Sequence, residues 1–399
     1  MKNTFKTVSA AFLIAFSNNI VAQQIGGGDN YIDVSGQEVK KDVEKRYNTI
    51  TTAVPFLTIA ADSRGGGMGD LGAATTTDVW SQQWNASKYA LAKNDMGIGL
   101  AYTPWLAHIT NDIHLIYASG YKKFSSGNDA IGAGLRYFSV GDIPAYDESG
   151  RSLEYNISPT EFAFDFSYSR KLADKFVMGL TGRFIYSNLN AAGSSELKAG
   201  KAVAADVSGT YFEDKIHLGA MPAAFRLGFN ISNIGSKIAY TQDQKDFIPT
   251  NFKLGAGLNL EIDKHNDLGF YLDLNKLLVP TPPFRDSTGI VKGKDPNVSP
   301  IAGIFQSFAD APGGFSEEMN EVMISGGAEY WYNKQFALRA GYFHEAKTKG
   351  NRKYFTVGLG LKMNVFGIDV AYLVPIHGTN SPLANTFRFS LSFDLGTRS

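Results

Sequence analysis

Large apolar and small or polar side chains alternate over most of this chain, and that alternation restricts the fold more than any other feature. In EFAFDFSY, residues 161–168, every second residue is aromatic, and the residues between are Glu, Ala, Asp and Ser. Successive side chains of a β-strand point to opposite faces, so this stretch predicts a strand with one aromatic face. The same pattern recurs at 225–231, 252–262, 268–274, 355–365 and 387–395.

About fourteen segments follow this pattern, and short connections between them alternate with long ones. The predicted strands are 96–105, 112–122, 129–140, 158–171, 175–188, 200–212, 221–232, 250–262, 267–278, 321–332, 335–347, 353–365, 366–377 and 385–395. The longest connection covers residues 280–320. An even number of antiparallel strands, with short turns at one end and long loops at the other, is typical of outer-membrane barrels. We therefore predict an all-β fold, a transmembrane antiparallel β-barrel over residues 95–399.

A water-soluble β-sandwich would also alternate, but its polar face would meet water and carry many charges. Here the polar face is mostly Gly, Ala and Ser, which suits a narrow barrel interior, while the aromatic face suits lipid. Twelve charged residues fall on the interior face, six basic and six acidic, and we expect ion pairs there; a polar conduit is the alternative. They are Arg136, Glu161, Asp165, Arg183, Asp206, Arg226, Asp273, Glu329, Arg339, Lys362, Asp369 and Arg388.

The N-terminus has the pattern of a secretory signal peptide. Lys2 and Lys6 precede a short apolar core at 10–16, and the small residue Ala22 ends the region. We expect residues 1–22 to be removed by cleavage after Ala22, and the protein to be exported to the outer membrane. Residues 23–49 are polar and predict a mobile N-terminal tail.

The composition argues against several classes of function. The chain has no cysteine, and its six histidines never stand at a metal-ligand spacing, so we predict neither a disulfide nor a metal site. Removing the two signal-peptide lysines leaves 36 basic and 38 acidic residues, a net charge near −2 that gives no case for binding nucleic acid. The sequence contains neither a G-x-S-x-G nor an H-E-x-x-H motif. Inward carboxylates such as Glu161 and Asp165 are able to do acid–base chemistry, but ion pairs in the lumen are the commoner reason for them, and we predict no enzyme activity and no cofactor.

The run GMGDLG, residues 67–72, matches the G-x-G-x-x-G pattern of a dinucleotide-binding loop. Such a loop opens a helix within a βαβ unit, whereas AATTTDVW follows here and the remaining chain predicts hairpins. We therefore interpret these glycines as positions that need positive φ or close backbone approach. Together with the aromatic residues Trp80, Trp84 and Tyr89, they predict that residues 50–94 fold back into the lumen as a hatch.

The long loop, residues 280–320, contains the stretch SPIAGIFQSFADA at 299–311. Ser299 is placed to cap a short helix that has Pro300 at its first position. The apolar residues that follow would share one helical face. With two further phenylalanines they are our candidates for a partner-binding surface, and packing against neighbouring loops is the alternative. The six candidates are Phe284, Ile301, Ile304, Phe305, Phe308 and Phe315.

Residues 51–89, TTAVPFLTIAADSRGGGMGDLGAATTTDVWSQQWNASKY, resemble the PorV family, also called LptO, of the type IX secretion system of Bacteroidetes. The positions that match are Ile50–Leu57, Asp62–Arg64, Met68–Asp70, Trp84–Asn85 and Lys88–Tyr89. Ala61, Thr77 and Ala86 stand where the family pattern has proline, which predicts a looser backbone. The resemblance implies a FadL-like barrel with an N-terminal hatch. The hatch residues that we single out are Asp62, Arg64, Gly67, Gly69, Asp70, Trp80, Trp84 and Asn85.

The resemblance also implies what such a barrel does. It would collect cargo proteins that carry a C-terminal signal domain from the translocon SprA, and deliver them to the peptidase PorU at the cell surface. Outer-membrane lipid and lipopolysaccharide would surround it. The alternative is a FadL-like transporter of hydrophobic small molecules, which requires an apolar pocket beside the hatch.

Overall fold

The structure is a computed structural model, and the residues that it describes are 30–32, 38–40, 47–107, 110, 112–146, 151–189, 198–242, 244–376, 383 and 386–397. The expected signal peptide, residues 1–22, and most of the expected tail, residues 23–49, lie outside the described residues. Within the described part of the chain, no helix is both long enough and apolar enough to cross a membrane.

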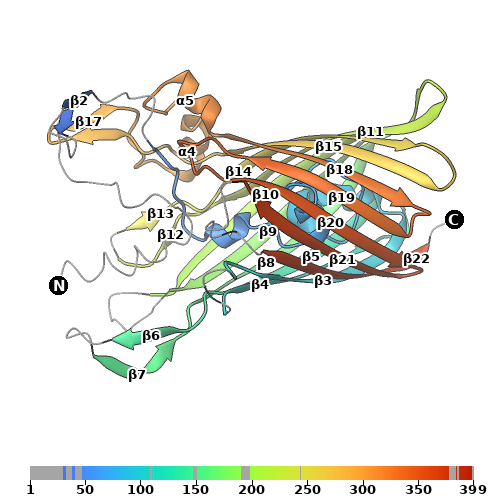
Figure 1. The fold of residues 1–399 in the computed structure, drawn as a ribbon, viewed down its shortest axis with the longest axis horizontal. Coiled ribbons are helices and arrows are strands. Elements are labelled where there is room, and N and C mark those ends of the chain that lie inside the picture. The colour runs from blue at the N-terminus through green and yellow to red at the C-terminus, as the bar shows by residue number, and fades with distance from the viewer. Residues whose placement is uncertain are drawn as a thin grey trace.

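Fourteen antiparallel strands form a closed barrel, which confirms the predicted fold class (Figure 1). The last strand pairs with the first, so that the sheet has no free edge. The strands are β3 (Asn94–Pro104), β4 (His114–Lys123), β5 (Asp129–Ser139), β8 (Thr160–Ala173), β9 (Phe176–Asn188), β10 (Gly200–Leu218), β11 (Met221–Gly235), β14 (Asn251–Glu261), β15 (Asn266–Leu277), β18 (Val322–Tyr332), β19 (Phe336–His344), β20 (Lys353–Met363), β21 (Phe366–Pro375) and β22 (Phe387–Thr397).

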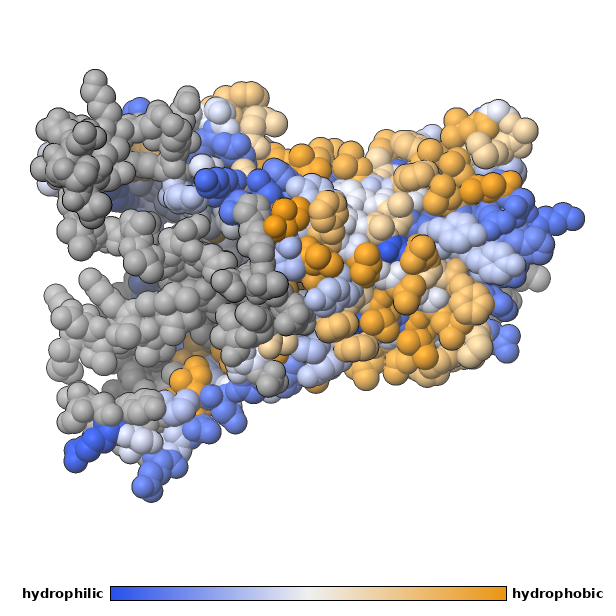
Figure 2. Space-filling model, in the orientation of Figure 1, coloured by the Kyte–Doolittle hydropathy of each residue, from blue (hydrophilic) through white to orange (hydrophobic). Residues whose placement is uncertain are grey.

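The two faces of the strands differ as the alternation predicts. On β8, Phe164 and Phe166 are 49% and 51% exposed. Their neighbours Ala163 and Asp165, which point to the opposite face, are buried. Figure 2 shows apolar residues gathered in a belt over the barrel strands. A lipid-facing wall with a polar interior follows from this pattern.

Short turns join the strands at one end of the barrel, which we call the turn end. The barrel begins and finishes there, since Asn94 pairs with Thr397. One prediction at this end is wrong: β10 was expected to stop at residue 212 but extends to Leu218, before a turn at Gly219. The pairing of β10 with β11 shifts register between Glu213 and Ile216, and such a bulge interrupts the alternation that marks a strand.

The opposite end, which we call the loop end, carries the long connections and their small elements (Figure 1). The elements are the hairpins β6 (Ile143–Tyr146) with β7 (Ser152–Ile157), β12 (Ile238–Ala239) with β13 (Lys245–Asp246), and β16 (Phe284–Asp286) with β17 (Gly289–Lys292), together with the helices α4 (Pro300–Gln306) and α5 (Phe315–Asn320).

Residues 55–91 lie inside the barrel and form four short helical pieces (Figure 1). They are η3 (Pro55–Thr58), α2 (Ser63–Gly66), α3 (Ser81–Trp84) and η4 (Ala86–Leu91). Helices of about one turn are not stable in isolation, so their shape depends on the wall around them. Further towards the N-terminus, β1 (Asn30–Ile32) pairs with β2 (Glu38–Lys40).

Candidate functional site

Residues 50–94, which we call the inner segment, run through the lumen from the loop end to the turn end. At the loop end, the backbone N–H of Asn48 donates to Thr348 O at 2.9 Å. At the turn end, Lys123 Nζ donates to Ala92 O at 2.8 Å. Between these two contacts most residues of the segment are buried. The segment therefore occupies the lumen along the length of the barrel.

Asp62 fixes the first turn of the inner segment and joins its two halves. Its Oδ1 accepts a hydrogen bond from the Gly65 N–H at 2.7 Å, which caps α2. Its Oδ2 accepts from Trp84 Nε1 at 2.6 Å. The Trp84 ring in turn lies under Lys253 Nζ, 4.3 Å from the ring centroid, so the wall contributes a cation–π contact.

Arg64 joins the inner segment to the wall through a buried ion pair. Its guanidinium donates two hydrogen bonds to the Glu329 carboxylate on β18, at 2.9 and 2.7 Å. It also donates to Asp78 Oδ2 at 2.8 Å and to both the carbonyl and hydroxyl oxygens of Thr76. Glu329 accepts a further bond from Arg339 at 2.8 Å. A bidentate pair with its remaining donors satisfied is the geometry in which a buried ion pair is stable.

The glycine run 67–72 approaches the wall more closely than a side chain would permit. Gly69 has φ +84°, and a Cβ there would lie 2.6 Å from Tyr342 O. The glycines of the wall are equally close, since a Cβ on Gly341 would lie 2.0 Å from the Met68 carbonyl carbon. Gly67 faces Gly358, with 3.2 Å between its ideal Cβ and the Gly358 Cα. The run thus packs backbone against backbone and leaves no space for a phosphate.

The other singled-out residues of the inner segment bind different parts of the wall. Asp70 accepts from Tyr354 OH at 2.6 Å and lies 3.0 Å from Arg388 Nη1. Trp80 stacks obliquely on Tyr117, with 6.1 Å between the ring centroids. Asn85 Nδ2 donates to Ala73 O, Gly209 O and Thr210 Oγ1. The eight residues therefore do not converge on one cavity; they attach the segment around the circumference of the lumen.

The prediction that the interior charges pair with one another is only partly correct. Arg388 pairs instead with the inner segment, and Asp273 accepts from the backbone N–H groups of Gly72 and Ala73 at 2.8 and 3.0 Å. Arg136 donates to the carbonyls of Phe56 and Leu57. A buried segment has backbone groups that need partners, and these wall charges supply them. Pairing within the wall is confirmed for Arg183 with Asp165 and Asp206, Arg339 with Glu329 and Asp369, and Lys362 with Asp394.

Two of the three positions where the family pattern has proline make hydrogen bonds that proline does not. The Ala61 N–H donates to Gln83 Oε1 at 3.2 Å. Thr77 Oγ1 donates to Lys88 O at 2.9 Å. The third, Ala86, is buried at the start of η4. Proline at these positions would stabilise the fold by lowering the conformational entropy of the unfolded chain. The hydrogen bonds of Ala61 and Thr77 offset part of the stability that is lost without it.

A second polar network joins the long loop to the loop end of the barrel. Lys276 Nζ lies 3.0 Å from Glu318 and 2.5 Å from Glu321, while Lys349 lies 2.6 Å from Glu317 and 2.9 Å from Glu321. The acidic side of α5 therefore faces the barrel. Burial raises the pKa of Asp310, which lies beside these carboxylates, to about 6.

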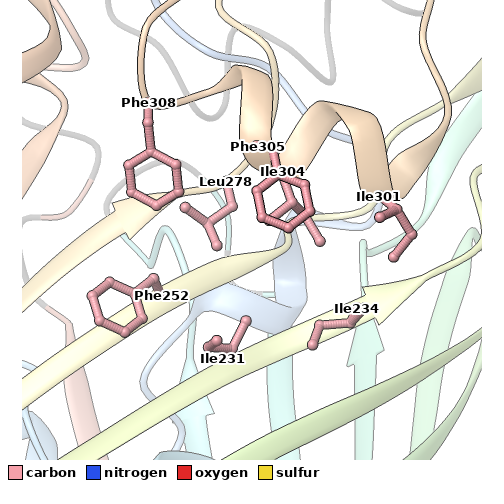
Figure 3. A pocket seen from close by; sticks show the side chains of 8 residues that line it. All are labelled: Ile231, Ile234, Phe252, Leu278, Ile301, Ile304, Phe305 and Phe308. Atoms are coloured by element: carbon pink, nitrogen blue, oxygen red, sulfur yellow. The ribbon is translucent and has the colours of Figure 1, made fainter.

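The long loop forms the capped helix that its sequence predicts. Ser299 Oγ accepts from the Ala302 N–H at 3.3 Å, and Pro300 is the first residue of α4. The apolar residues of α4 and of the turn after it point toward the outer wall of the barrel across a hollow of about 380 Å³ (Figure 3). Both faces of this hollow are apolar. It is lined by Ile231, Ile234, Phe252, Leu278, Ile301, Ile304, Phe305 and Phe308.

The remaining loop candidates lie apart from the hollow. Phe284 begins β16 and is half-buried. Phe315 projects from α5 and is 80% exposed, and Met319 one turn later is also exposed. Met319 was not singled out from the sequence, although its i, i+4 spacing from Phe315 is the signal that would have found it. Across the described part of the chain, no three His, Cys, Asp or Glu side chains gather as metal ligands.

Comparison with solved structures returned several bacterial channels that cover nearly all of their own chains. They include the CymD monoaromatic hydrocarbon channel (14% identity, 86% of this chain and 99% of that chain, TM-score 0.46). The toluene transporter TbuX of Ralstonia pickettii (12%, 86% and 99%, 0.48) and the toluene transporter TodX of P. putida (10%, 85% and 99%, 0.47) are also similar. At these scores and identities the likeness has no bearing on function.

Comparison with protein sequences gives the family. A search of curated proteins found no significant match. The family model described as "Type IX secretion system protein PorV" matches residues 41–284, which is more than half of the chain and includes the inner segment. The chain belongs to the PorV family of type IX secretion system proteins.

Proposed function

We propose that this protein is the outer-membrane shuttle of the type IX secretion system. It collects cargo with a C-terminal signal domain from the translocon SprA and delivers it to the peptidase PorU. Family membership over residues 41–284 is the observation that carries the proposal. The cargo crosses the membrane through another pore, because the inner segment is bound along the whole lumen of this barrel.

In this proposal the inner segment serves as a hatch that stays in place while cargo is handled outside. The contacts of Arg64, Asp70 and Asn85 support this role, because each binds a different strand of the wall. A closed barrel of this kind acts through its external surface. In this proposal the external loops recognise the cargo.

We assign the protein contacts to the long loop, residues 280–320, with α5 as the leading candidate. The acidic residues of α5 face buried lysines, so its apolar residues Phe315 and Met319 are left on the outside. Exposed apolar residues on a helix whose polar side is satisfied internally favour a protein or membrane contact. Phe284 and the α4 residues belong to the same loop and remain candidates.

The test is cargo localisation in a strain that lacks the gene and is complemented with variants. Without the protein, cargo with type IX signals should remain in the periplasm. Deletion of 299–311 and the pair Phe315→Ser with Met319→Ser should each abolish co-purification of cargo without lowering barrel abundance. Val291→Ser, at an exposed residue of the hairpin in the same loop, is the matched control and should leave co-purification unchanged.

The same strain distinguishes the alternative. A FadL-like transporter of hydrophobic small molecules would leave secretion intact and lose uptake of a hydrophobic nutrient instead. Normal secretion of cargo in the deletion strain would reject the shuttle. Full cargo yield with both loop variants would reject the assignment to the long loop but not the shuttle itself.

A further inference from the structure

The hairpin of β10 and β11 projects beyond its neighbours at the turn end. Strand β9 pairs with β10 only as far as Tyr211, and β14 pairs with β11 only from Ala223 onward. Residues 213–222 therefore form a two-stranded ribbon that has no neighbouring strand on either side. The ribbon ends in a two-residue turn, in which Gly219 has φ +65° and Ala220 follows it.

A β-bulge bends this ribbon away from the barrel. Between the pairs Glu213–Phe225 and Ile216–Ala223, β10 has two residues where β11 has one. An extra residue on one strand bends that strand and increases its twist. Figure 1 shows the hairpin turning outward from the barrel beside the label β11. The face of the ribbon that continues the outer surface of the wall is thereby turned toward the membrane.

The outer face of the ribbon is apolar at its tip. Ile216 and Leu218 alternate along β10, and Leu218 pairs directly with Met221 on β11, so these three residues share one face. Leu218 and Met221 are 44% and 38% exposed. Leu227 lies on the same face of β11, further along the wall, and is 43% exposed. The apolar tip is therefore continuous with the lipid-facing wall.

The charged residues at the bend suit phospholipid headgroups. Glu213 is paired with Lys175, and Asp214 is paired with Arg226. Within the described part of the chain, Lys215 is exposed and has no acidic partner. A lysine can keep its ammonium among headgroups while its alkyl stem lies on apolar surface. The free charge of the bend is thus opposite in sign to a lipid phosphate.

We propose that residues 213–222 form a second membrane contact, in which the bulge turns Leu218 and Met221 into the periplasmic leaflet. The short turns of outer-membrane barrels face the periplasm, and the leaflet on that side consists of phospholipid. Apolar residues of an interfacial segment insert to the boundary between headgroups and acyl chains. Because the hairpin stands on one side of the barrel, this contact restrains the tilt of the barrel. The inference goes beyond the proposed function and does not depend on it.

The experiment places a nitroxide at residue 218 of the full-length protein in vesicles of phosphatidylethanolamine and phosphatidylglycerol. The chain has no cysteine, so Leu218→Cys gives a single labelling site. Collisions of the nitroxide with oxygen, which concentrates in lipid, are compared with collisions with a water-soluble nickel chelate. Leu100→Cys on the lipid-facing wall and Lys264→Cys in an exposed turn are the reference positions. The oxygen-to-nickel ratio at residue 218 should lie near that of Leu100→Cys and severalfold above that of Lys264→Cys.

Two further changes in the labelled protein test the cause. Deletion of Lys215 removes the extra residue of the bulge, so the ribbon should straighten and the ratio at residue 218 should fall severalfold. Met221→Asp puts a carboxylate beside the label and should give the same fall without altering the bulge. The control is Lys122→Asp, at an exposed residue of β4, which is not adjacent to the hairpin, and it should leave the ratio unchanged. Heat-modified migration on gels verifies that each variant is folded.

Three results would overturn the proposal. If the nickel chelate reaches the label at residue 218 as readily as the label at residue 264, the hairpin lies free in the periplasm. If both oxygen and nickel are excluded from the label, protein covers the tip. If the ratio is unchanged both by deletion of Lys215 and by Met221→Asp, neither the bulge nor the apolar face holds the tip in lipid. Failure of the shuttle leaves these measurements unaffected, since no cargo is present in them.

Discussion

Replacing Arg64 by methionine should loosen the inner segment from the barrel wall. The guanidinium donates five hydrogen bonds to Glu329, Asp78 and Thr76 at 2.6–3.0 Å. Removing one partner of a buried ion pair costs about 3–5 kcal/mol, because the other charge remains buried. Glu329 keeps Arg339 at 2.8 Å. We therefore expect the lower end of that range, about 3 kcal/mol, which is about a hundredfold in an equilibrium constant.

Two measurements test this expectation. Denaturant unfolding of the purified barrel in detergent should show the loss of stability, and recordings in planar bilayers should show more frequent channel openings, since Arg64 joins α2 to β18. Arg170→Met is the matched control. Its side chain is 59% exposed and its contact with Asp129 is 3.5 Å long. A surface pair of this kind contributes about 0–1 kcal/mol, so the control should change little.

A double variant separates the ion pair from a general loss of packing. Arg64→Met combined with Glu329→Gln removes both charges, so it should cost less than the sum of the two single substitutions. Arg339 retains Asp369 as a partner in that variant, at 2.5 Å. Unchanged unfolding and conductance in Arg64→Met, or additive costs in the double variant, would refute this reasoning.

The remaining predictions concern the barrel wall, the inner segment and the long loop at the loop end. Gly327→Ala should lower the free energy of unfolding by about 1–3 kcal/mol. Its methyl group would lie 2.4 Å from Met68 O, whereas the adjacent Gly326→Ala has open space and should change little in the same unfolding assay. Asn85→Ala removes three donated hydrogen bonds and should cost about 2–4 kcal/mol in that assay. Burial raises the pKa of Asp310 to about 6, above its value in the unfolded chain. The loop should therefore resist proteolysis better as the pH falls from 7.5 through 6, and Asp310→Asn should remove that gain. Burial opposes ionisation of Glu317, but the hydrogen bonds from Lys349, the Gly313 N–H and Asn48, together with the charge of Lys349, outweigh it and lower the pKa of Glu317. The stability that Glu317 contributes is consequently lost only at lower pH, as the pH falls from the unfolded value of 4.5 through the folded pKa.

The barrel was predictable from the sequence because alternation is a local property of each strand. Lipid outside the barrel and a crowded lumen inside it require opposite residue types at successive positions of a strand. Strands such as β8 and β15 can therefore be predicted from their own residues, without knowing which strands pair with them. The end of β10 was missed for a local reason as well. The bulge between Glu213 and Ile216 puts two successive residues on the side where the pattern requires one.

The contacts of the inner segment were not predictable, because their partners lie far along the chain. Alternation indicated that Asp273 points inward, but its acceptor role depends on Gly72 and Ala73, about two hundred positions away. Equal numbers of inward acidic and basic residues are compatible both with ion pairs within the wall and with ion pairs between the wall and the inner segment. The face of α4 posed the same problem. Its helix and cap follow from Ser299 and Pro300, whereas the wall opposite comes from β11 and β14.

The start of the inner segment and the long loop share one network, so the lumen and the external surface are not independent. The side-chain amide of Asn48 donates to Glu317 on α5 at 2.9 Å, and its backbone donates to Thr348. A protein that draws α5 away from the barrel must break the first contact and leave a partly buried amide short of an acceptor, at a cost of about 1–3 kcal/mol. The next attachments to the barrel wall along the segment are those of the Phe56 and Leu57 carbonyls to Arg136, followed by Arg64 on Glu329. A pull on α5 therefore acts on residues 48–55 first, and the bonds to Arg136 and the ion pair at Arg64 keep it from reaching the rest of the lumen.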